Sequence, residues 1–328
     1  MYDTDAAADY IYQVCFHMDD CPLSDGTEGS WEDIKARVEE AISPLEHAPV
    51  TLNTAHASYA LSETDVRAII LVTLYKPGLL FPISYAFLSA LLKDDRPRMA
   101  AILDALVIYP SADTLCKDCP SNPTCPAPAS PDAQFVIACS DGDSPAQMTI
   151  ADWTDYFVQL RNQSAIGTPW SEVRFHCAGW TARPKYRFTG PFTTPAHDPA
   201  LVEGIPAAPL LFMSSRVDPV TPLTNAYAMA ARHPGSGVLV QESVGHCALG
   251  AAVSSCTERF VRAYFENGTV PEEGTVCEED CGEFELCAEA EKMTAPIPVL
   301  GRGALPGMGE LDSERLEGLS AALMQEWS

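Results

Sequence analysis

An aspartate and a histidine follow two strand-like runs that are successive in the chain. Asp218 comes shortly after the apolar run at 210–215, and His246 follows the run at 237–241. The carboxyl ends of parallel strands meet at one edge of a sheet, so we expect these two side chains to make contact. The carboxylate would accept the Nδ1 proton of the histidine and fix its tautomer, leaving Nε2 to take a proton from a hydroxyl. The pair therefore predicts the orienting acid and the base of a nucleophilic hydrolase.

A serine nucleophile is missing from this pattern. No Gly-x-Ser-x-Gly elbow occurs in the 328 residues. Ser144 follows an apolar run, but Pro145 comes next and has no N–H to donate to an oxyanion. Ser214 and Ser215 precede the acid on its own strand, where we expect them to point away from the site. The sequence thus carries a base and its orienting acid without a recognisable nucleophile.

Twelve cysteines point to a framework of disulfides. Cys247 adjoins His246 too closely for the usual thiol–imidazole approach, and we expect it to pair with Cys256 or another cysteine. Two other sets of cysteines have spacings that could also hold zinc, namely Cys116, Cys119, Cys125 and Cys139, and Cys277, Cys281 and Cys287. Glycosylation sequons at Asn162 and Asn267 indicate an oxidising compartment and favour disulfides over metal.

The charge of the chain limits its partners. Forty-five acidic residues against 20 basic ones give a formal net charge of −25. Such a chain repels phosphate backbones and anionic headgroups, so we expect no nucleic-acid partner and no membrane surface. A peptide with a free amino terminus is compatible with this charge. The chemistry expected of the acid–base pair needs no cofactor.

Helices dominate the first part of the predicted structure. The apolar region at 68–92 is interrupted by Lys76-Pro77-Gly78, which predicts two short buried helices joined by a turn rather than a membrane span. Ser30 and Asp33 form a helix-capping pattern. Helical spacing is found at 3–18, after Ser30, and at 64–74, 82–92, 97–107 and 149–161.

The second part of the chain changes character. The proline- and cysteine-rich segment 110–131 predicts a pinned loop, the apolar run 135–139 predicts a buried strand, and 165–208 reads as mostly irregular. From residue 206 onward, strand-like and helical patterns alternate, with Thr221-Pro222 as a helix entry. The pattern predicts an α/β fold. Beyond Cys277 the chain is acidic, then rich in glycine and proline, and only weakly helical at 312–327.

These residues carry a resemblance to a known family. The part of the chain from Pro209 to Cys277 resembles the carboxy-terminal part of tripeptidyl-aminopeptidase-like serine peptidases. These peptidases have the α/β-hydrolase fold and belong to the wider prolyl-aminopeptidase family. The matching motifs are Pro209–Met213, Asp218–Pro222, Gln241–Cys247, Val261–Phe265, Gly268–Pro271 and Cys277. Four upstream segments are similar to the helical cap of that family, namely Asp3–Cys21, Tyr75–Pro77, Ala138–Gly142 and Cys177–Trp180.

The resemblance implies a partial α/β-hydrolase in which Asp218 is the triad acid and His246 the triad base. It implies a mostly helical cap at 1–205, the last core strands at 206–276 and a cysteine-bearing acidic and Gly/Pro-rich tail at 277–328. The family places its serine elbow and oxyanion loop before the cap, so we expect both to precede Met1. The parent reaction would release short peptides from a free amino terminus, and we expect the chain as given to be inactive.

Two alternatives stay open at this point. The chain could be a non-catalytic remnant or binding module that keeps the pocket of the cap without turnover. A separate chain could also supply the nucleophile, because exposed edges of core strands bury poorly and tend to pair with a partner. We expect weak stability for the same reason.

Two further expectations concern the substrate and the location of the protein. Asp141 and Asp143 follow the apolar run at 135–139 and are candidates to bind a substrate ammonium, although an Asp-Gly turn explains them as well. The disulfide framework suggests a secreted parent protein, yet the residues after Met1 form no secretory signal. A truncated amino terminus would reconcile these two observations.

Overall fold

The computed structural model describes residues 2–53, 58–106, 131–190, 192–193 and 209–281. The loop predicted at 110–131 falls outside this range except for its last residue, and the tail beyond residue 281 lies outside it. The expectations for Cys116, Cys119, Cys125 and Cys287 therefore concern residues that are not described here.

Five helices and a hairpin make up the first part of the molecule. The helices are α1 (Thr4–His17), α2 (Trp31–Ile42), α3 (Glu63–Thr73), α4 (Pro77–Leu92) and α5 (Arg96–Leu106). The 3-10 helix η1 (Ser43–Glu46) follows α2, and strands β1 (Val50–Asn53) and β2 (Ser58–Leu61) form an antiparallel pair. The predicted cap of α2 is confirmed, because Ser30 and Asp33 form a reciprocal capping box.

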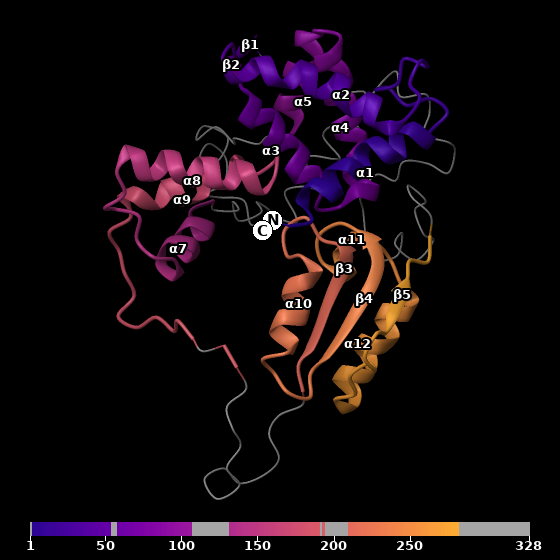
Figure 1. The fold of residues 1–328 in the computed structure, drawn as a ribbon, viewed down its shortest axis with the longest axis vertical. Coiled ribbons are helices and arrows are strands. Elements are labelled where there is room, and N and C mark those ends of the chain that lie inside the picture. Colours follow the sequence, from indigo (N-terminus) through magenta and orange to yellow (C-terminus); the bar gives the residue numbers. More distant parts are fainter. Residues whose placement is uncertain (1, 54–57, 107–130, 191, 194–208, 282–328) are drawn as a thin grey trace, which may run out of the picture.

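Helix α4 lies at the centre of this helical group. Its aromatic side chains Phe81, Tyr85 and Phe87 are completely buried, and the Tyr85 hydroxyl donates to the carbonyl oxygen of Ile11 at 2.9 Å. A helix that is apolar on every side must be covered by other helices, as α4 is (Figure 1). The prediction of two helices joined by a turn is confirmed, because α3 ends at Thr73 and α4 begins at Pro77. The predicted start of the second helix at Pro82 is wrong, because α4 contains Pro82.

Proline is tolerated in the first turn of a helix, where its missing N–H costs nothing, so Pro77 opens α4. Within the described residues, no helix combines the length and the apolar character that crossing a membrane requires.

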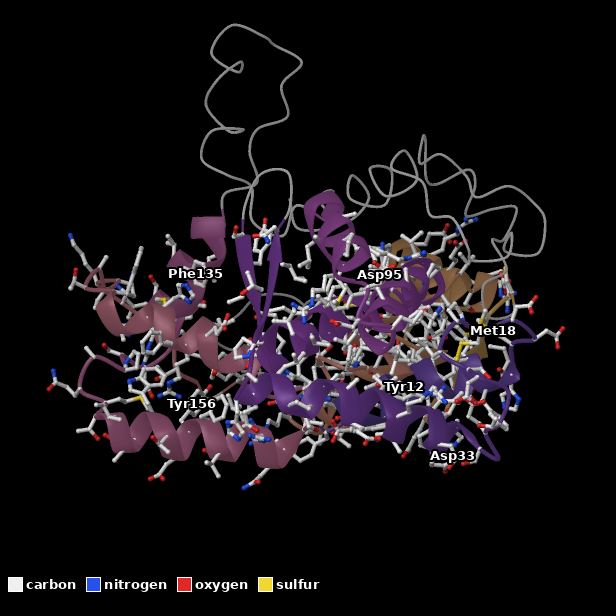
Figure 2. The ribbon with its side chains drawn as sticks, turned by 90° about the horizontal axis from the view of Figure 1, so that it is seen from above. Tyr12, Met18, Asp33, Asp95, Phe135 and Tyr156 are labelled. Carbon is white, nitrogen blue, oxygen red and sulfur yellow. A yellow bond between two sulfur atoms is a disulfide. The ribbon has the colours of Figure 1, made fainter. Side chains whose placement is uncertain are left out.

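A second helical group stands beside the first (Figure 1). It contains α7 (Pro131–Asp141), α8 (Ile150–Gln163), α9 (Pro169–His176) and the 3-10 helix η2 (Cys177–Gly179). A disulfide between Cys139 and Cys177 ties α7 to η2, and the ring of Phe135 stacks on His176 at 4.4 Å. Figure 2 shows Phe135 and Tyr156 together in this group, at the opposite end of the molecule from Met18.

The strand predicted at 135–139 is wrong, because these residues lie within α7. A short apolar run does not distinguish a strand from a helix, since both can bury it. Val136 and Ile137 are in fact 42% and 62% exposed, and the contacts of this run are made through Phe135 and Cys139. The sequence reading also missed α9, although Thr168-Pro169 has the same entry pattern as Thr221-Pro222.

The last part of the described chain forms a parallel sheet. Strands β3 (Leu211–Val217), β4 (Gly237–Val244) and β5 (Val276–Glu278) pair in the order β3-β4-β5. They are connected by α10 (Leu223–Ala230), α11 (Ala248–Ala251) and α12 (Ser255–Asn267), as Figure 1 shows. A disulfide between Cys256 and Cys277 joins α12 to β5. The alternating pattern from residue 206 is thus confirmed, with β5 as an unforeseen strand, and the fold is α/β and mostly helical.

The first helical group, which contains α1 to α5, covers the carboxyl edge of this sheet. The Thr4 hydroxyl, which is fully buried, donates to the carbonyl oxygen of Pro219 at 2.7 Å. The His246 amide donates to the carbonyl oxygen of Tyr75 at 3.0 Å, just before α4 begins. Gly245 has φ +132°, and a Cβ on it would lie 2.8 Å from Cδ of Pro77. These contacts fix the turn after β4 against the α3–α4 connection.

Candidate active site

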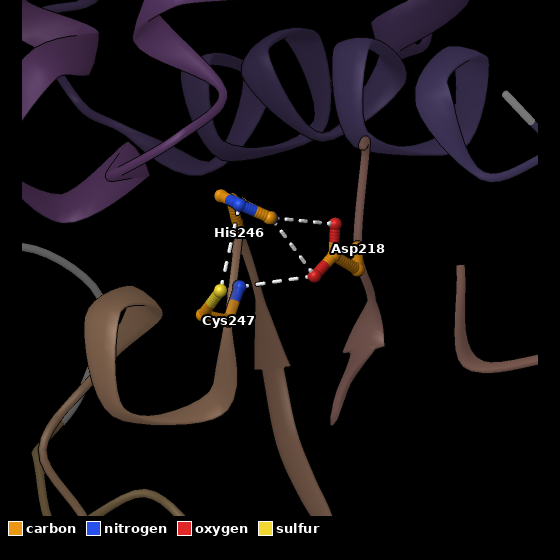
Figure 3. Close-up of side chains that lie close together, drawn as sticks. All are labelled: Asp218, His246 and Cys247. Atoms are coloured by element: carbon orange, nitrogen blue, oxygen red, sulfur yellow. Dashed lines mark hydrogen bonds and ion pairs between the residues drawn. The ribbon is translucent and has the colours of Figure 1, made fainter. Parts of the chain in front are cut away.

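Asp218 and His246 meet at the carboxyl edge of two paired strands. Asp218 follows the last residue of β3, and His246 lies two residues beyond the end of β4. The strands end in register, with Val217 opposite Val244. His246 Nδ1 lies 3.1 Å from Oδ1 and 3.2 Å from Oδ2 of Asp218 (Figure 3). The structure therefore brings together the two residues that the sequence predicts as acid and base.

A turn after β3 holds the Asp218 carboxylate in place. Oδ1 accepts from the amides of Val220 and Thr221 at 2.8 and 2.7 Å. Oδ2 accepts from the Thr221 hydroxyl and the Cys247 amide, both at 2.9 Å. The side chain is buried. Burial alone would raise the pKa of Asp218, but the hydrogen bonds from His246 and from the three backbone amides outweigh burial and lower it. The Asp218 carboxylate is thus a fixed negative charge next to Nδ1 of the imidazole.

The environment of His246 favours the protonated imidazolium. The hydrogen bond to Asp218, followed by the contact with Cys247, raises the pKa of His246 to about 10, against the opposing effect of burial. The ring of Tyr75 packs edge-on against the imidazole with centroids 5.0 Å apart, and the Thr221 hydroxyl lies 3.4 Å from Nδ1. Burial also raises the pKa of Tyr75, to about 12, so its hydroxyl stays neutral at ordinary pH.

The structure places the Cys247 thiol beside the imidazole, contrary to the prediction from the sequence. Its Sγ lies 3.4 Å from Nε2 of His246, and it is a free, exposed thiol (Figure 3). The expected pairing with Cys256 is wrong, since Cys256 bonds to Cys277. The expectation that adjacent residues would keep thiol and imidazole apart holds for regular backbone. At Cys247 the backbone turns with φ +62° into α11, and the thiol comes to lie beside the ring.

The cluster of Asp218, His246 and Cys247 also has the proximity needed for ligands of one metal ion, with one ligand atom from each within 4.8 Å of the others. The carboxylate, however, already accepts two backbone N–H groups on Oδ1, and an amide and a hydroxyl on Oδ2. A metal would have to displace these donors. The arrangement is better described as a hydrogen-bonded acid–base cluster.

The serines weighed as nucleophiles lie elsewhere. Ser144 is exposed beyond the end of α7, where its hydroxyl oxygen lies 3.4 Å from the amide of Ala146. Ser214 and Ser215 are buried in β3; the Ser214 hydroxyl donates to the Ser215 carbonyl, and the Ser215 hydroxyl has no partner. Among the described residues, no serine forms a hydrogen bond with His246.

The two candidate substrate-binding carboxylates lie at the end of α7 and just beyond it. Asp141 is the last residue of α7 and is exposed. Asp143 pairs with Arg187 at 2.6 Å, and this contact lowers its pKa. Figure 1 shows α7 in the helical group beside the sheet rather than over its carboxyl edge. The structure therefore does not bring these carboxylates to the Asp218–His246 pair.

Sequence reasoning missed three residues of the site. Thr221 was read only as a helix cap, although it donates both its amide and its hydroxyl to Asp218. The Asp-x-x-Thr spacing after a strand was the available signal. Tyr75 and Cys247 had no comparable signal, because their positions depend on how the α3–α4 connection and the turn after β4 pack together.

Comparison with known proteins finds a family match for part of the chain. Residues 163–277 match the model of a family described as TAP-like protein, a family of α/β-hydrolases. A search of the curated proteins finds no match to the chain. The matched segment includes the sheet, Asp218 and His246. This part of the chain is therefore similar to the TAP-like α/β-hydrolases.

Proposed function

We propose that the chain supplies the acid and the base of a serine-type hydrolase that cleaves peptides from a free amino terminus. The observation that carries the proposal is the 3.1 Å contact between His246 Nδ1 and Asp218 Oδ1 at the ends of adjacent parallel strands. Asp218 orients the imidazole and stabilises its charged form, and His246 transfers the proton at Nε2. The serine and the oxyanion donors come from outside the described residues.

The chemistry requires a change at Nε2. With a pKa of about 10, His246 is protonated at neutral pH and cannot accept a proton from a hydroxyl. Part of this shift comes from the Cys247 thiol beside Nε2. In the proposed enzyme, a serine hydroxyl takes the place of the thiol next to Nε2. Removal of the thiol contact takes away the second cause of the high pKa of His246 and lowers it toward the range in which the ring can act as a base.

The proposed substrate class follows from charge. A chain of net charge −25 attracts an ammonium group, and an aminopeptidase must hold the substrate by that group. We propose Asp141 and Asp143 as its partners, with the ammonium replacing Arg187 beside Asp143. Replacing either aspartate by asparagine should raise KM for a peptide with a free amino terminus and leave kcat nearly unchanged. An equal loss for an N-acetylated peptide would contradict this role.

The open edge of the sheet suggests where further protein binds. Within the described residues β3 pairs with β4 alone and therefore lies at one edge of the sheet. Leu210, at its beginning, is 43% exposed. Unpaired edge strands accept another strand readily. We propose that the part carrying the serine adds a strand to β3, either from the same chain or from a partner. Nucleic acid and membrane surfaces are not proposed partners.

We propose an extracellular location for the complete protein. Three disulfides among the described residues support it, namely Cys15–Cys21, Cys139–Cys177 and Cys256–Cys277. The sequon begins at Asn267, which is the exposed last residue of α12. A shift in mobility after glycosidase treatment of the protein from its native source would support secretion. An unmodified protein with reduced cysteines would contradict it.

A non-catalytic binding role is the second candidate, because the thiol lies beside Nε2, where a catalytic hydroxyl would need to be. A fluorophosphonate probe separates the two. We expect no labelling of the chain as given. Reading the coding DNA on the 5′ side of Met1 shows whether a strand and a Gly-x-Ser-x-Gly elbow lie in frame. If they do, the joined protein should be labelled at that serine and should cleave a fluorogenic tripeptide amide.

Replacing His246 by glutamine should abolish both labelling and cleavage in the joined protein. A stop codon in place of the elbow, with no labelled partner, would favour the binding role. A labelled serine in the chain as given would overturn the proposal that the nucleophile lies outside the described residues, and mapping the adduct would identify it.

A further inference from the structure

The thiol of Cys247 has no part in the proposed hydrolysis, yet it lies in a complete row of acid, imidazole and thiol. Sγ is 3.4 Å from Nε2 of His246, and Nδ1 of the same ring is 3.1 Å from Asp218. The thiol is free and exposed, whereas Asp218 is 1% exposed. The reactive end of this row therefore faces solvent, and its charged end is buried.

We propose that Cys247 is a site of thiol–disulfide exchange with small neutral or cationic disulfides, and that His246 acts as its proton carrier. The thiolate is the attacking form of cysteine, and a neighbouring imidazolium stabilises it. Asp218 holds the imidazolium from the opposite side of the ring. Papain-type cysteine chemistry relies on the same principle of a paired thiolate and imidazolium.

The exchange balances without any further reactant. The Cys247 thiol gives its proton to water beside the charged His246 imidazolium, and the resulting thiolate attacks one sulfur of the disulfide R–S–S–R. The S–S bond of the reagent breaks, a Cys247–S–S–R bond forms, and an RS⁻ group leaves. The imidazolium gives its Nε2 proton to RS⁻, which departs as the thiol RSH, and the ring then regains a proton from water. No net oxidation occurs, because one disulfide replaces another.

The surroundings favour this reaction over acyl transfer. Attack on a carbonyl needs N–H donors for the developing oxyanion, and the Cys247 amide is already donated to Asp218 at 2.9 Å. Attack on sulfur needs only a thiolate, an acid for the leaving group and access. Tyr75 packs against the imidazole, and its hydroxyl is neutral at ordinary pH because its pKa is raised. The Thr221 hydroxyl, which lies near Nδ1, is uncharged as well, so neither residue adds a charge beside the ring.

The charge of the reagent follows from the charge of the protein. A net charge of −25 and the buried Asp218 carboxylate repel anionic disulfides. A neutral reagent meets no such barrier, and a cationic one is attracted. Cystamine, a cationic disulfide, should therefore react faster than an anionic disulfide such as oxidised glutathione, and the difference should shrink as salt is added.

The test is the rate of adduct formation at pH 6 with neutral 2-hydroxyethyl disulfide, with the site mapped by peptide mass spectrometry. We expect the adduct at Cys247. An ordinary thiol is only about 0.3% ionised at pH 6, so a thiol kept fully ionised by a neighbouring imidazolium would have about 300-fold more thiolate. A stabilised thiolate is also a weaker nucleophile, which reduces the expected increase in rate by about tenfold. The protein should therefore react at least about tenfold faster than its His246→Gln variant.

Two controls keep the result decisive. Cys247→Ser should lose the adduct and remain folded, because serine differs only at the exposed Sγ position. If His246→Gln does not fold, the unmodified protein still gives an answer, since converting the thiol to a mixed disulfide should lower the pKa of His246 measured by NMR.

Adducts only at other cysteines, equal rates for the two proteins, or an unchanged His246 titration after labelling would overturn the proposal. None of these readouts requires hydrolysis, so their failure is distinct from failure of the proposed function.

Discussion

Replacement of Asp218 by asparagine tests the electrostatic argument at the site most directly. The hydrogen bond that this carboxylate accepts is the largest cause of the high pKa of His246, which rises from 6.5 to about 10. Asparagine keeps the size of the side chain and removes its charge. We therefore expect the pKa of His246 to fall from about 10 toward the ordinary value for histidine.

The same shift links folding to pH. The pKa of His246 is higher in the folded chain than in the unfolded chain, so its stabilisation is complete below pH 6.5 and is lost as the pH rises through about 10. One proton held only by the folded state gives a slope of about 1.4 kcal/mol per pH unit. Solvent reaches 24% of the His246 side chain, so we expect a smaller loss, on the order of 2 kcal/mol, between pH 7 and 9.

Two measurements check these numbers. NMR titration of the imidazole gives its pKa in the parent protein and in the Asp218→Asn variant. Urea unfolding at pH 7, 8 and 9 gives the slope, and subtraction of a His246→Gln variant removes the contribution of every other group. An imidazole that titrates near 6.5 in the parent protein, or identically in both proteins, would refute the reasoning. If Asp218→Asn does not fold, the comparison with His246→Gln still measures the slope.

Three further variants test contacts that hold the fold and the site. Replacing Cys139 and Cys177 together by serine opens a loop with a sequence separation of 38 and should lower the free energy of unfolding by about 4 kcal/mol, measured with denaturant. Thr4→Val removes the buried hydrogen bond to Pro219 and should cost about 1–2 kcal/mol; an unchanged urea midpoint would show that this contact contributes nothing. Gly245→Ala places a Cβ 2.8 Å from a proline carbon at a φ of +132° and should cost more than about 2 kcal/mol, with a shifted imidazole NMR signal as the second readout.

Local patterns in the sequence were sufficient to predict the contact between Asp218 and His246. Asp218 and His246 follow strands whose pairing and direction are set by the alternation of strand and helix, so their contact could be predicted. The capping box at Ser30 was equally local, because all its atoms lie within four residues. These predictions required no knowledge of how distant segments pack.

The errors came from features that depend on packing. The run at 135–139 is apolar in either secondary structure, and the disulfide from Cys139 to Cys177 decides its surroundings. The proline at residue 82 suggested a boundary, yet α4 continues through it because the surrounding helices bury its apolar side chains. The prediction that the Cys247 thiol stays away from the imidazole was wrong for the same reason. The orientation of this side chain follows from a positive φ, which the neighbouring residue types do not indicate.

The atom beside Nε2 decides which chemistry His246 can perform. Asp218 holds the ring from Nδ1 in any case, and its carboxylate favours the imidazolium whatever lies opposite. A thiol next to Nε2 adds a second group that stabilises the proton on the ring, which suits a residue that protonates a leaving thiolate. A hydroxyl adds no such charge, so we expect the pKa of the ring to be lower beside a hydroxyl than beside the thiol. Because the Cys247 thiol already lies beside Nε2, an element that brings a hydroxyl to this atom must also turn the thiol away. The proposed hydrolysis and the proposed disulfide exchange would therefore exclude each other at this histidine.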